Sequence, residues 1–243
     1  MLAAAPMPIA ILMPAYDEPG RLADTLGGVR AGAAALGGVT LFLVDDGSDP
    51  PIDPAVLPSP TPAFRLVLAR HALNLGQGAA LETARQLALR EPAFAAYVTM
   101  DADGQHRIED VAALVQAIEA GADVALGDRF GGDSNVPAAR RALIHAARLF
   151  ERTLTGLRLS DAHNGFRAFS RGALAQVQIR ENRMAHATEI TRQLSRTRQG
   201  ERLSLVEIPV SVRYTRETLA KGQRSLGAFA VLRDLFYRYL FEE

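Results

Sequence analysis

Short apolar segments alternate with longer helical patterns along the first half of the chain. Buried strands are expected over residues 9–13, 39–44, 64–69, 95–100 and 122–126, and helical periodicity covers residues 18–36, 78–90 and 108–120. The proline-rich segment 50–62 is expected to be a surface loop. Strands that alternate with helices of this length predict parallel βαβ units with right-handed crossovers. The first half is therefore expected to form a doubly wound α/β sheet.

The second half follows a different pattern. Residues 137–157 and 187–198 are expected to be amphipathic helices, and residues 203–212 a strand. The last segment, 225–241, carries a stripe of leucine and aromatic residues with arginines beside it. Such a helix either packs in the core or lies against anionic lipid or a membrane partner, and the sequence leaves both open. Neither a linker nor an internal repeat is visible, so residues 1–243 are expected to form one domain.

Composition narrows the class of protein. Hydrophobic residues make up 48% of the 243 residues and charged residues 22%, a balance typical of a soluble globular protein. Lysine plus arginine equal aspartate plus glutamate at 27 each, so no overall charge favours nucleic acid. The absence of cysteine excludes disulfides and thiolate metal sites. No apolar run reaches the roughly 18 residues of a membrane span, and the first residues make a poor signal peptide. We expect a cytoplasmic protein, soluble or peripheral at the inner face of the cytoplasmic membrane.

The strand expected over residues 95–100 stops at two aspartates, Asp101 and Asp103, followed by Gly104. Ligands of open α/β sheets bind outside the carboxyl ends of the strands, so these carboxylates stand where a ligand would be held. Two side chains separated by one residue, as Asp101 and Asp103 are, lie on the same face of a strand. Two oxygen donors placed in this way can share a divalent cation. The alternative is an ordinary solvated turn.

Polar residues follow three other expected strands as well. They occupy segments 14–18, 45–48 and 127–129, and these should meet residues 101–105 at one edge of the sheet. Taken singly, each segment is explained by a helix cap, a turn or a surface ion pair. Together they supply an aromatic ring, several carboxylates and a glycine, which a nucleoside diphosphate with its metal requires.

Several segments match a known family. They are Pro-Ala-Tyr-Asp-Glu at 14–18, Val-Asp-Asp-Gly-Ser at 44–48, Asn-Leu-Gly-Gln-Gly at 74–78, Asp-Ala-Asp-Gly-Gln-His at 101–106 and Gly-Asp-Arg at 127–129. In this order they resemble the inverting family 2 glycosyltransferases of the GT-A fold, above all the dolichyl- or polyprenyl-phosphate sugar synthases and bacterial cell-envelope transferases. The resemblance continues through segments 161–167, 184–189, 212–214 and 221–225.

The resemblance implies a Rossmann-like GT-A fold, a central and mostly parallel sheet flanked by helices. Residues 1–130 would bind the nucleotide sugar, and residues 131–243 would form the acceptor side. The residues implied to line the nucleotide pocket are Pro14, Ala15, Tyr16, Glu18, Asp101 and Ala102. Asp46, or Asp45 beside it, would recognise the base edge or the ribose. Asp17 stands where the family usually has asparagine, which puts its polar contact in doubt.

The same resemblance implies a site for Mg²⁺ or Mn²⁺. Asp103 would bind the ion that bridges the diphosphate, with Asp101 and Gln105 as further ligands, and Gln105 would otherwise face the sugar. Such an ion neutralises charge that develops on the leaving nucleoside diphosphate, and this selective stabilisation of the transition state speeds the reaction.

Cationic side chains are implied to bind the anionic groups. Arg129 would hold an acceptor phosphate or the diphosphate, because a guanidinium suits either. Arg213 and Lys221 would close over the diphosphate, with segment 215–224 as a lid; both are otherwise explained as solvent-exposed charges. Arg140 or Arg141 would bind an acceptor phosphate, unless the basic stripe on that helix is plain surface.

The acceptor decides whether a general base is needed. A polyprenyl phosphate already presents an anionic oxygen, whereas a sugar hydroxyl requires a base. The candidate bases are Asp161 and Glu189, although Asp161 also suits a turn and Glu189 the start of a helix. His163 and His186 are interpreted as interior or surface groups rather than metal ligands.

The expected function is inverting transfer of a sugar from a UDP- or GDP-sugar to an acceptor in cell-envelope glycan synthesis. Polyprenyl phosphate is the preferred acceptor, with a saccharide hydroxyl of an envelope polysaccharide as the alternative. A different class is a non-catalytic sugar-nucleotide-binding subunit of a membrane complex. A dinucleotide oxidoreductase is disfavoured, because no Gly-x-Gly-x-x-Gly turn follows the first strand.

Overall fold

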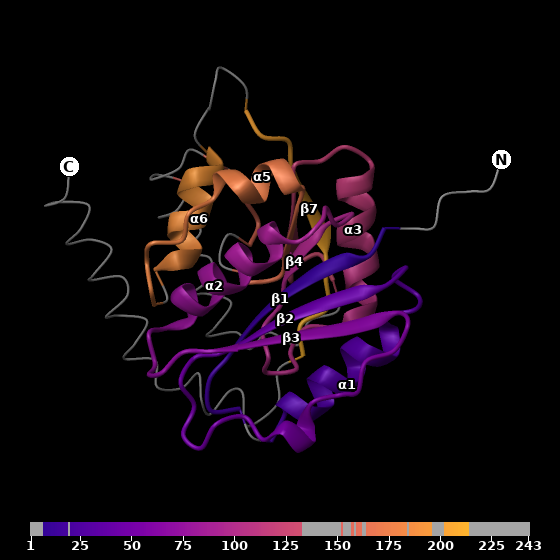
Figure 1. The fold of residues 1–243 in the computed structure, drawn as a ribbon. Helices are drawn as coiled ribbons and strands as arrows, with labels where there is room; N and C mark the ends of the chain where they lie inside the picture. The colour runs from indigo at the N-terminus through magenta and orange to yellow at the C-terminus, as the bar shows by residue number, and fades with distance from the viewer. Residues whose placement is uncertain are drawn as a thin grey trace, which may run out of the picture.

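A seven-stranded sheet forms the centre of the computed structural model, which describes residues 7–18, 20–132, 152, 157, 159–161, 164–183, 185–195 and 202–213 (Figure 1). Its strands are β1 (Ile9–Ala15), β2 (Val39–Asp45), β3 (Phe64–Arg70), β4 (Tyr97–Thr99), β5 (Val124–Asp128), β6 (Arg167–Phe169) and β7 (Leu205–Pro209). They lie in the order β3-β2-β1-β4-β6-β5-β7. Strand β6 runs antiparallel to β4 and β5, and the other neighbours are parallel.

Helices cover both faces of the sheet (Figure 1). One face carries α1 (Leu22–Gly32) and α3 (Val111–Glu119), which a 3-10 turn over Ile108–Asp110 precedes. The other face carries α2 (Gln77–Arg90), α5 (Arg171–Gln176) and α6 (His186–Ser195). A second 3-10 turn, Pro54–Val56, interrupts the proline-rich loop. The described residues thus form three layers.

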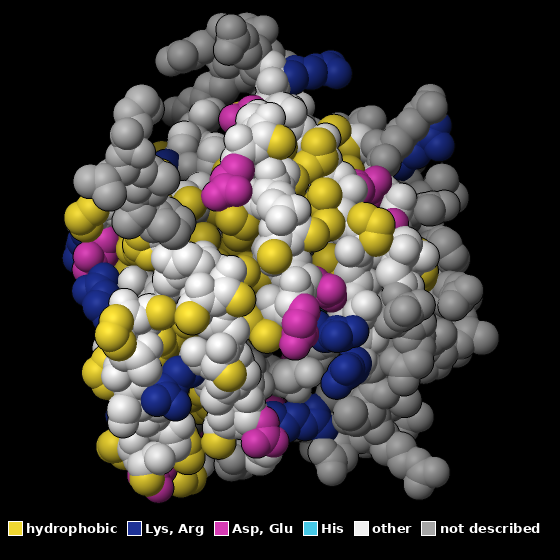
Figure 2. All heavy atoms as spheres, turned by 90° about the vertical axis from the view of Figure 1, so that its right-hand side faces the viewer, with side chains coloured by type: hydrophobic (Ala, Val, Ile, Leu, Met, Phe, Trp, Pro, Cys, Tyr) yellow, Lys and Arg dark blue, Asp and Glu magenta, His cyan; other side chains and the backbone are white. Residues whose placement is uncertain are grey.

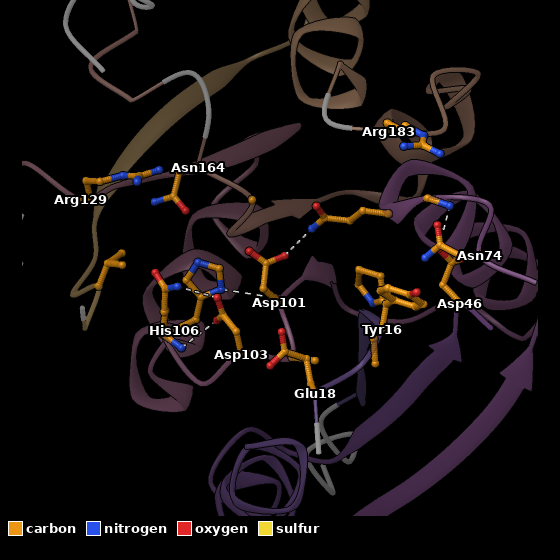
Figure 3. A pocket seen from close by; sticks show the side chains of 18 residues that line it. Tyr16, Glu18, Asp46, Asn74, Asp101, Asp103, His106, Arg129, Asn164 and Arg183 are labelled. Atoms are coloured by element: carbon orange, nitrogen blue, oxygen red, sulfur yellow. Dashed lines mark hydrogen bonds between the residues drawn. The ribbon is translucent and has the colours of Figure 1, made fainter. Parts of the chain in front are cut away.

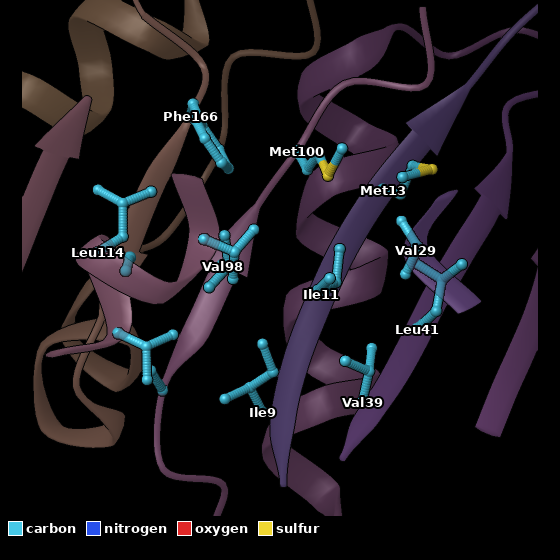
Figure 4. Packing of buried hydrophobic residues seen from close by; sticks show 14 of the residues in the cluster. Ile9, Ile11, Met13, Val29, Val39, Leu41, Val98, Met100, Leu114 and Phe166 are labelled. Atoms are coloured by element: carbon cyan, nitrogen blue, oxygen red, sulfur yellow. The ribbon is translucent and has the colours of Figure 1, made fainter. Parts of the chain in front are cut away.

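The alternation of side chains along β1 divides the core in two. Ile9, Ile11 and Met13 pack on the side of α1 and α3 (Figure 4), whereas Ala10 and Leu12 face α2. Every residue of β1 and β2 is buried, as expected for parallel strands with helices on both faces. The one charged residue of these two strands, Asp45, lies at the end of β2.

The sequence predicted most of these elements. The expected fold class, a mostly parallel α/β sheet flanked by helices, is confirmed, and the strands and helices of the first half shift by a few residues only. The expected strand 203–212 is shorter, as β7, and α6 runs over 186–195. Strand β6 and helix α5 were not expected from the local pattern.

Other predictions lie outside the described residues. These are the helix over 225–241, the lid over 215–224 and almost all of the helix over 137–157. The single-domain assignment of residues 1–243, with halves 1–130 and 131–243, stays a prediction.

The surface carries charges of both signs. On the face shown in Figure 2, acidic and basic side chains lie beside each other between scattered hydrophobic ones. In the part of the chain that the structure describes, no helix has the length and apolar character needed to cross a membrane.

Truncation in the central strand should destabilise the fold. Ile11 is fully buried in β1 between β2 and β4, so Ile11→Ala should lower the free energy of unfolding by about 2–5 kcal/mol. Leu73, which is 61% exposed, is the control. Leu73→Ala should change the free energy of unfolding by less than about 0.5 kcal/mol. Urea denaturation measures both. Equal losses in the two variants would contradict this core assignment.

Candidate active site

A cavity of about 590 Å³ lies at the carboxyl ends of the parallel strands (Figure 3). Most of the residues predicted for the site line it: Pro14, Ala15, Tyr16, Glu18, Asp46, Asp101, Ala102, Asp103, Gln105 and Arg129. They come from the end of β1 and from the loops that follow β1, β2, β4 and β5. Parallel strands thus bring together segments that are more than a hundred residues apart in sequence.

The cavity has three regions along its length. Figure 3 shows Tyr16 and Asp46 with Asn74 at one end and the aspartates 101 and 103 in the middle. Arg129 lies at the other end, beside Asn164. An aromatic end, an acidic middle and a basic end are therefore arranged in a row.

The two central aspartates are held by amide groups. Asp101 Oδ1 accepts a hydrogen bond from Gln77 Nε2 at 2.9 Å. Asp103 accepts from the backbone N–H of Gln105 at 3.0 Å and from its Nε2 at 2.6 Å. Burial, and then the charge of Asp101, raise the pKa of Asp103. Two like charges crowded in a partly buried site favour a bound cation.

The donor set at these aspartates suits a hard divalent cation. Carboxylate and amide oxygens are the ligands that Mg²⁺ and Mn²⁺ prefer. Gly165 faces Asp101, and a Cβ at this glycine would stand 3.2 Å from Asp101 Oδ2, so glycine leaves space at the carboxylate. No cluster of three His, Asp or Glu ligands occurs among the described residues.

Asp46 is largely engaged by its own loop. Its Oδ1 accepts from His71 Nδ1 at 2.7 Å and from the Leu75 N–H at 3.0 Å, and its Oδ2 accepts from the Gly76 N–H at 2.7 Å. A carboxylate has about four acceptor positions, so one on Oδ2 remains for a ligand.

Asp45, the alternative to Asp46, does not line the cavity. It is buried and accepts hydrogen bonds from Ser48 N–H, Ile52 N–H and Arg70 Nε. Burial tends to raise the pKa of Asp45, but the bonds from Ser48, Ile52 and Arg70 outweigh it and lower the pKa. Asp45 therefore stabilises its loop.

Asp17 also points away from the cavity. Its Oδ1 accepts from the Asp49 N–H at 3.3 Å, and its own N–H donates to Ser48 Oγ at 3.1 Å. Its φ of 47° lies in the left-handed region, which aspartate and asparagine tolerate better than most residues. Asp17 thus links the loop that follows β1 to the loop that follows β2.

Neither of the two candidate bases lies on the cavity wall. Asp161 is buried, and its Oδ2 accepts from Arg129 Nε at 2.5 Å and from the Arg129 N–H at 3.2 Å. Glu189 lies in the first turn of α6, where its Oε2 accepts from the N–H groups of Arg180 and Glu181, both at 2.9 Å. Asp161 thus holds Arg129, and Glu189 holds the loop before α6.

Arg213 lies on the other side of the aspartate loop. Its backbone N–H donates to Gln105 O at 3.0 Å, and it lines a second cavity of about 340 Å³ beside Arg21 and Arg107. His186 is buried with Nδ1 2.7 Å from Arg183 O, so it is an interior group as interpreted. Lys221, His163, Arg140 and Arg141 lie outside the described residues.

Several residues on the cavity wall were not assigned from the sequence: Asn74, Gly76, Gln77, His106, Asn164, Gly165, Arg183 and Val212. Most of them lie in or beside the matched segments, so position in a motif was the available signal. For Arg183 the available signal was its place next to segment 184–189.

Neutralising Asp103 should stabilise the metal-free protein. Its raised pKa means that the folded state binds a proton more readily than the unfolded state, so ionisation costs stability as pH rises above about 4. Asp103→Asn should therefore melt a few degrees above wild type at pH 7–8. The difference should vanish near pH 4. A variant that melts below wild type at pH 8 without metal would contradict this electrostatic picture.

Comparison with known proteins agrees with this geometry. A family model described as glycosyl transferase family 2 matches residues 10–178. The chain is 31% identical to polyprenol monophosphomannose synthase of Mycolicibacterium smegmatis, over 70% of this chain and 64% of that protein. It is 29% identical to undecaprenyl-phosphate mannosyltransferase of Micrococcus luteus, over 91% of this chain and 89% of that protein.

A solved structure shares the fold. Glucosyl-3-phosphoglycerate synthase from Mycobacterium tuberculosis, in complex with Mn²⁺, uridine diphosphate and phosphoglyceric acid, superposes with a TM-score of 0.61 at 17% identity. The match covers 93% of this chain and 77% of that chain. Since the family model spans more than half of the chain, this protein belongs to glycosyl transferase family 2 and has the GT-A fold.

Proposed function

We propose that the protein transfers a sugar from a nucleoside diphosphate sugar to polyprenyl phosphate with the help of Mg²⁺ or Mn²⁺. The observation that carries the proposal is the row formed by the aromatic end, the acidic middle and the basic end of the cavity. The names of the two relatives agree with a lipid phosphate acceptor. Such an acceptor lies in a membrane, so the enzyme would work at the membrane surface, directly or through a membrane partner, in cell-envelope glycan synthesis.

The donor nucleotide would occupy the end that holds Tyr16 and Asp46. The Tyr16 side chain is 46% exposed, so its ring is available to stack on a base. The remaining acceptor position of Asp46 suits one N–H of the base or one ribose hydroxyl. Pro14, Ala15 and Glu18 complete the wall at this end.

The diphosphate would lie over the acidic middle of the cavity. Asp101 and Asp103, with Gln105 beside them, would hold the divalent ion. When bound, this ion neutralises charge on the diphosphate leaving group. Gln77 and Gln105 fix the carboxylates through the hydrogen bonds described above, so the site is oriented before the donor binds.

The acceptor phosphate would bind at the basic end. Arg129 presents a guanidinium there, and the hydrogen bond that it donates to Asp161 sets its orientation. A phosphate oxygen is already anionic and attacks the anomeric carbon without a protein base, in a single displacement that inverts configuration. This agrees with Asp161 and Glu189 both being committed to other contacts.

Removal of either central carboxylate should abolish transfer. With polyprenyl phosphate, a UDP- or GDP-sugar and Mn²⁺, Asp101→Asn and Asp103→Asn should each lower kcat/KM by at least about 100-fold. Chelation of the metal should do the same to wild type. Asp53, which is exposed and caps a 3-10 turn, gives the control Asp53→Asn, expected within about twofold of wild type.

The other outcomes of this assay are equally informative. Transfer to a saccharide hydroxyl but not to the lipid would overturn the acceptor. Binding of the donor without turnover on any acceptor would indicate a non-catalytic subunit. Full activity of both aspartate variants would overturn the metal-dependent mechanism.

Loss of the basic end should affect the acceptor alone. Arg129→Ala should raise KM for polyprenyl phosphate by about tenfold or more, because a charged hydrogen-bonding partner is removed. The dissociation constant of the nucleoside diphosphate should stay within about twofold of wild type. Arg129→Lys keeps the charge in the buried pair and guards against misfolding. A change in nucleotide binding with an unchanged acceptor KM would place Arg129 on the donor instead.

A further inference from the structure

Arginine supplies the cationic groups on the cavity wall within the described residues, at positions 129 and 183. Arg129 is paired with Asp161. The Arg183 side chain is exposed, and in the described part of the chain it makes neither an ion pair nor a hydrogen bond. The wall also carries four carboxylates, from Glu18, Asp46, Asp101 and Asp103. A negatively charged ligand in such a cavity needs every available cation.

The loop that carries Arg183 is held at several points. Glu189 accepts hydrogen bonds from two of its backbone N–H groups, those of residues 180 and 181. Asn182 O accepts from the Gly78 N–H at 2.8 Å. Arg183 O accepts from the His186 N–H at 3.1 Å and lies 2.7 Å from His186 Nδ1. Hydrogen bonds thus fix the backbone of Arg183, whereas its side chain lines the cavity and is available to a ligand.

Two glycines allow this loop to approach the site. A Cβ at Gly76 would clash with Asn182 O, and a Cβ at Gly78 would clash with Glu181 O. Any side chain at these positions would push the loop outward. Gln77, between the two glycines, donates to Asp101. One packing contact therefore places both Arg183 and the amide that orients the central carboxylate.

The position of Arg183 in the cavity indicates which ligand group it binds. In Figure 3 it lies on the same side as Asn74 and Asp46, across the cavity from Glu18 and away from Arg129. We propose that Arg183 binds the phosphate groups of the donor, clamping the diphosphate from the side opposite to Glu18. The proposal rests on the proposed function, since it needs a nucleoside diphosphate in this cavity. A guanidinium with several N–H donors matches phosphate oxygens.

Nucleotide titration tests this role. Calorimetry with Mn²⁺ would measure the dissociation constants of UDP, GDP and their nucleosides for wild type, Arg183→Ala and Arg183→Lys. For the diphosphate that wild type binds, Arg183→Ala should weaken binding by about tenfold or more, and Arg183→Lys should restore part of it. Binding of the nucleoside, which lacks phosphate, should be unchanged. The donor KM should rise and the acceptor KM should not.

Arg180 provides a matched control. It lies in the same loop, its side chain bonds to Gln178 Oε1 rather than lining the cavity, and Arg180→Ala keeps the backbone N–H that bonds to Glu189. This variant should bind the diphosphate like wild type, and both alanine variants should melt within about two degrees of wild type, because exposed side chains contribute little stability.

The outcomes separate the two proposals. If wild type binds neither diphosphate, the proposed function fails. If wild type binds and Arg183→Ala binds equally well, the role of Arg183 is overturned while the function stands. If only the acceptor KM rises in Arg183→Ala, the phosphate that it binds belongs to the acceptor and the donor assignment is wrong.

Discussion

Burial of the central strands on both faces is the constraint from which the site follows. Strands β1 and β2 are buried along their whole length, and their one charged residue, Asp45, is the last residue of β2. Parallel neighbours in register end at the same edge of the sheet. Ala15 at the end of β1 pairs with Asp45 at the end of β2, and Leu12 pairs with Thr99, two residues before Asp101. The cavity forms where these ends meet.

The hydrogen bonds at the carboxyl edge of the sheet distinguish aspartates that stabilise the loops of the site from aspartates that are available to bind a ligand. Asp45 is held by its own loop and by Arg70, and Oδ2 of Asp161 accepts hydrogen bonds from Arg129. Asp101 and Asp103 are oriented by glutamines, and burial together with the charge of Asp101 raises the pKa of Asp103. A bound cation at these two carboxylates would offset this electrostatic cost. Aspartates of the same chemistry thus have different roles: Asp45 and Asp161 support loops and an arginine, whereas Asp101 and Asp103 form the acidic middle of the cavity.

The sequence was informative where the signal is local. Apolar runs, glycines and aspartates predicted β1 to β5, the shared edge and the central carboxylates, because period and turn chemistry are written in neighbouring residues. It failed for β6, three residues long, which enters between β4 and β5 through antiparallel pairing. A strand this short has no period to detect, and its partners lie far away in sequence.

The site was predicted unevenly for the same reason. Aspartates after a strand suggest a ligand, but the sequence did not distinguish Asp45 from Asp46. That difference lies in which carboxylate the backbone of residues 75 and 76 reaches. Asp161 and Glu189 were candidate bases because they are carboxylates. Their hydrogen-bond partners are Arg129 and the N–H groups of a loop, and only tertiary packing brings these partners close. Arg183 approaches the cavity through two glycines a hundred residues earlier, a contact that no local pattern encodes.

The proposed mechanism depends on a divalent ion that Asp101 and Asp103 hold against a nucleoside diphosphate. The decisive measurement is an anomalous difference map from crystals grown with Mn²⁺ and a nucleoside diphosphate. We expect a peak within about 2.5 Å of oxygens from both carboxylates and from the diphosphate. A bound nucleotide with no manganese peak at these aspartates, or a peak elsewhere in the molecule, would contradict it.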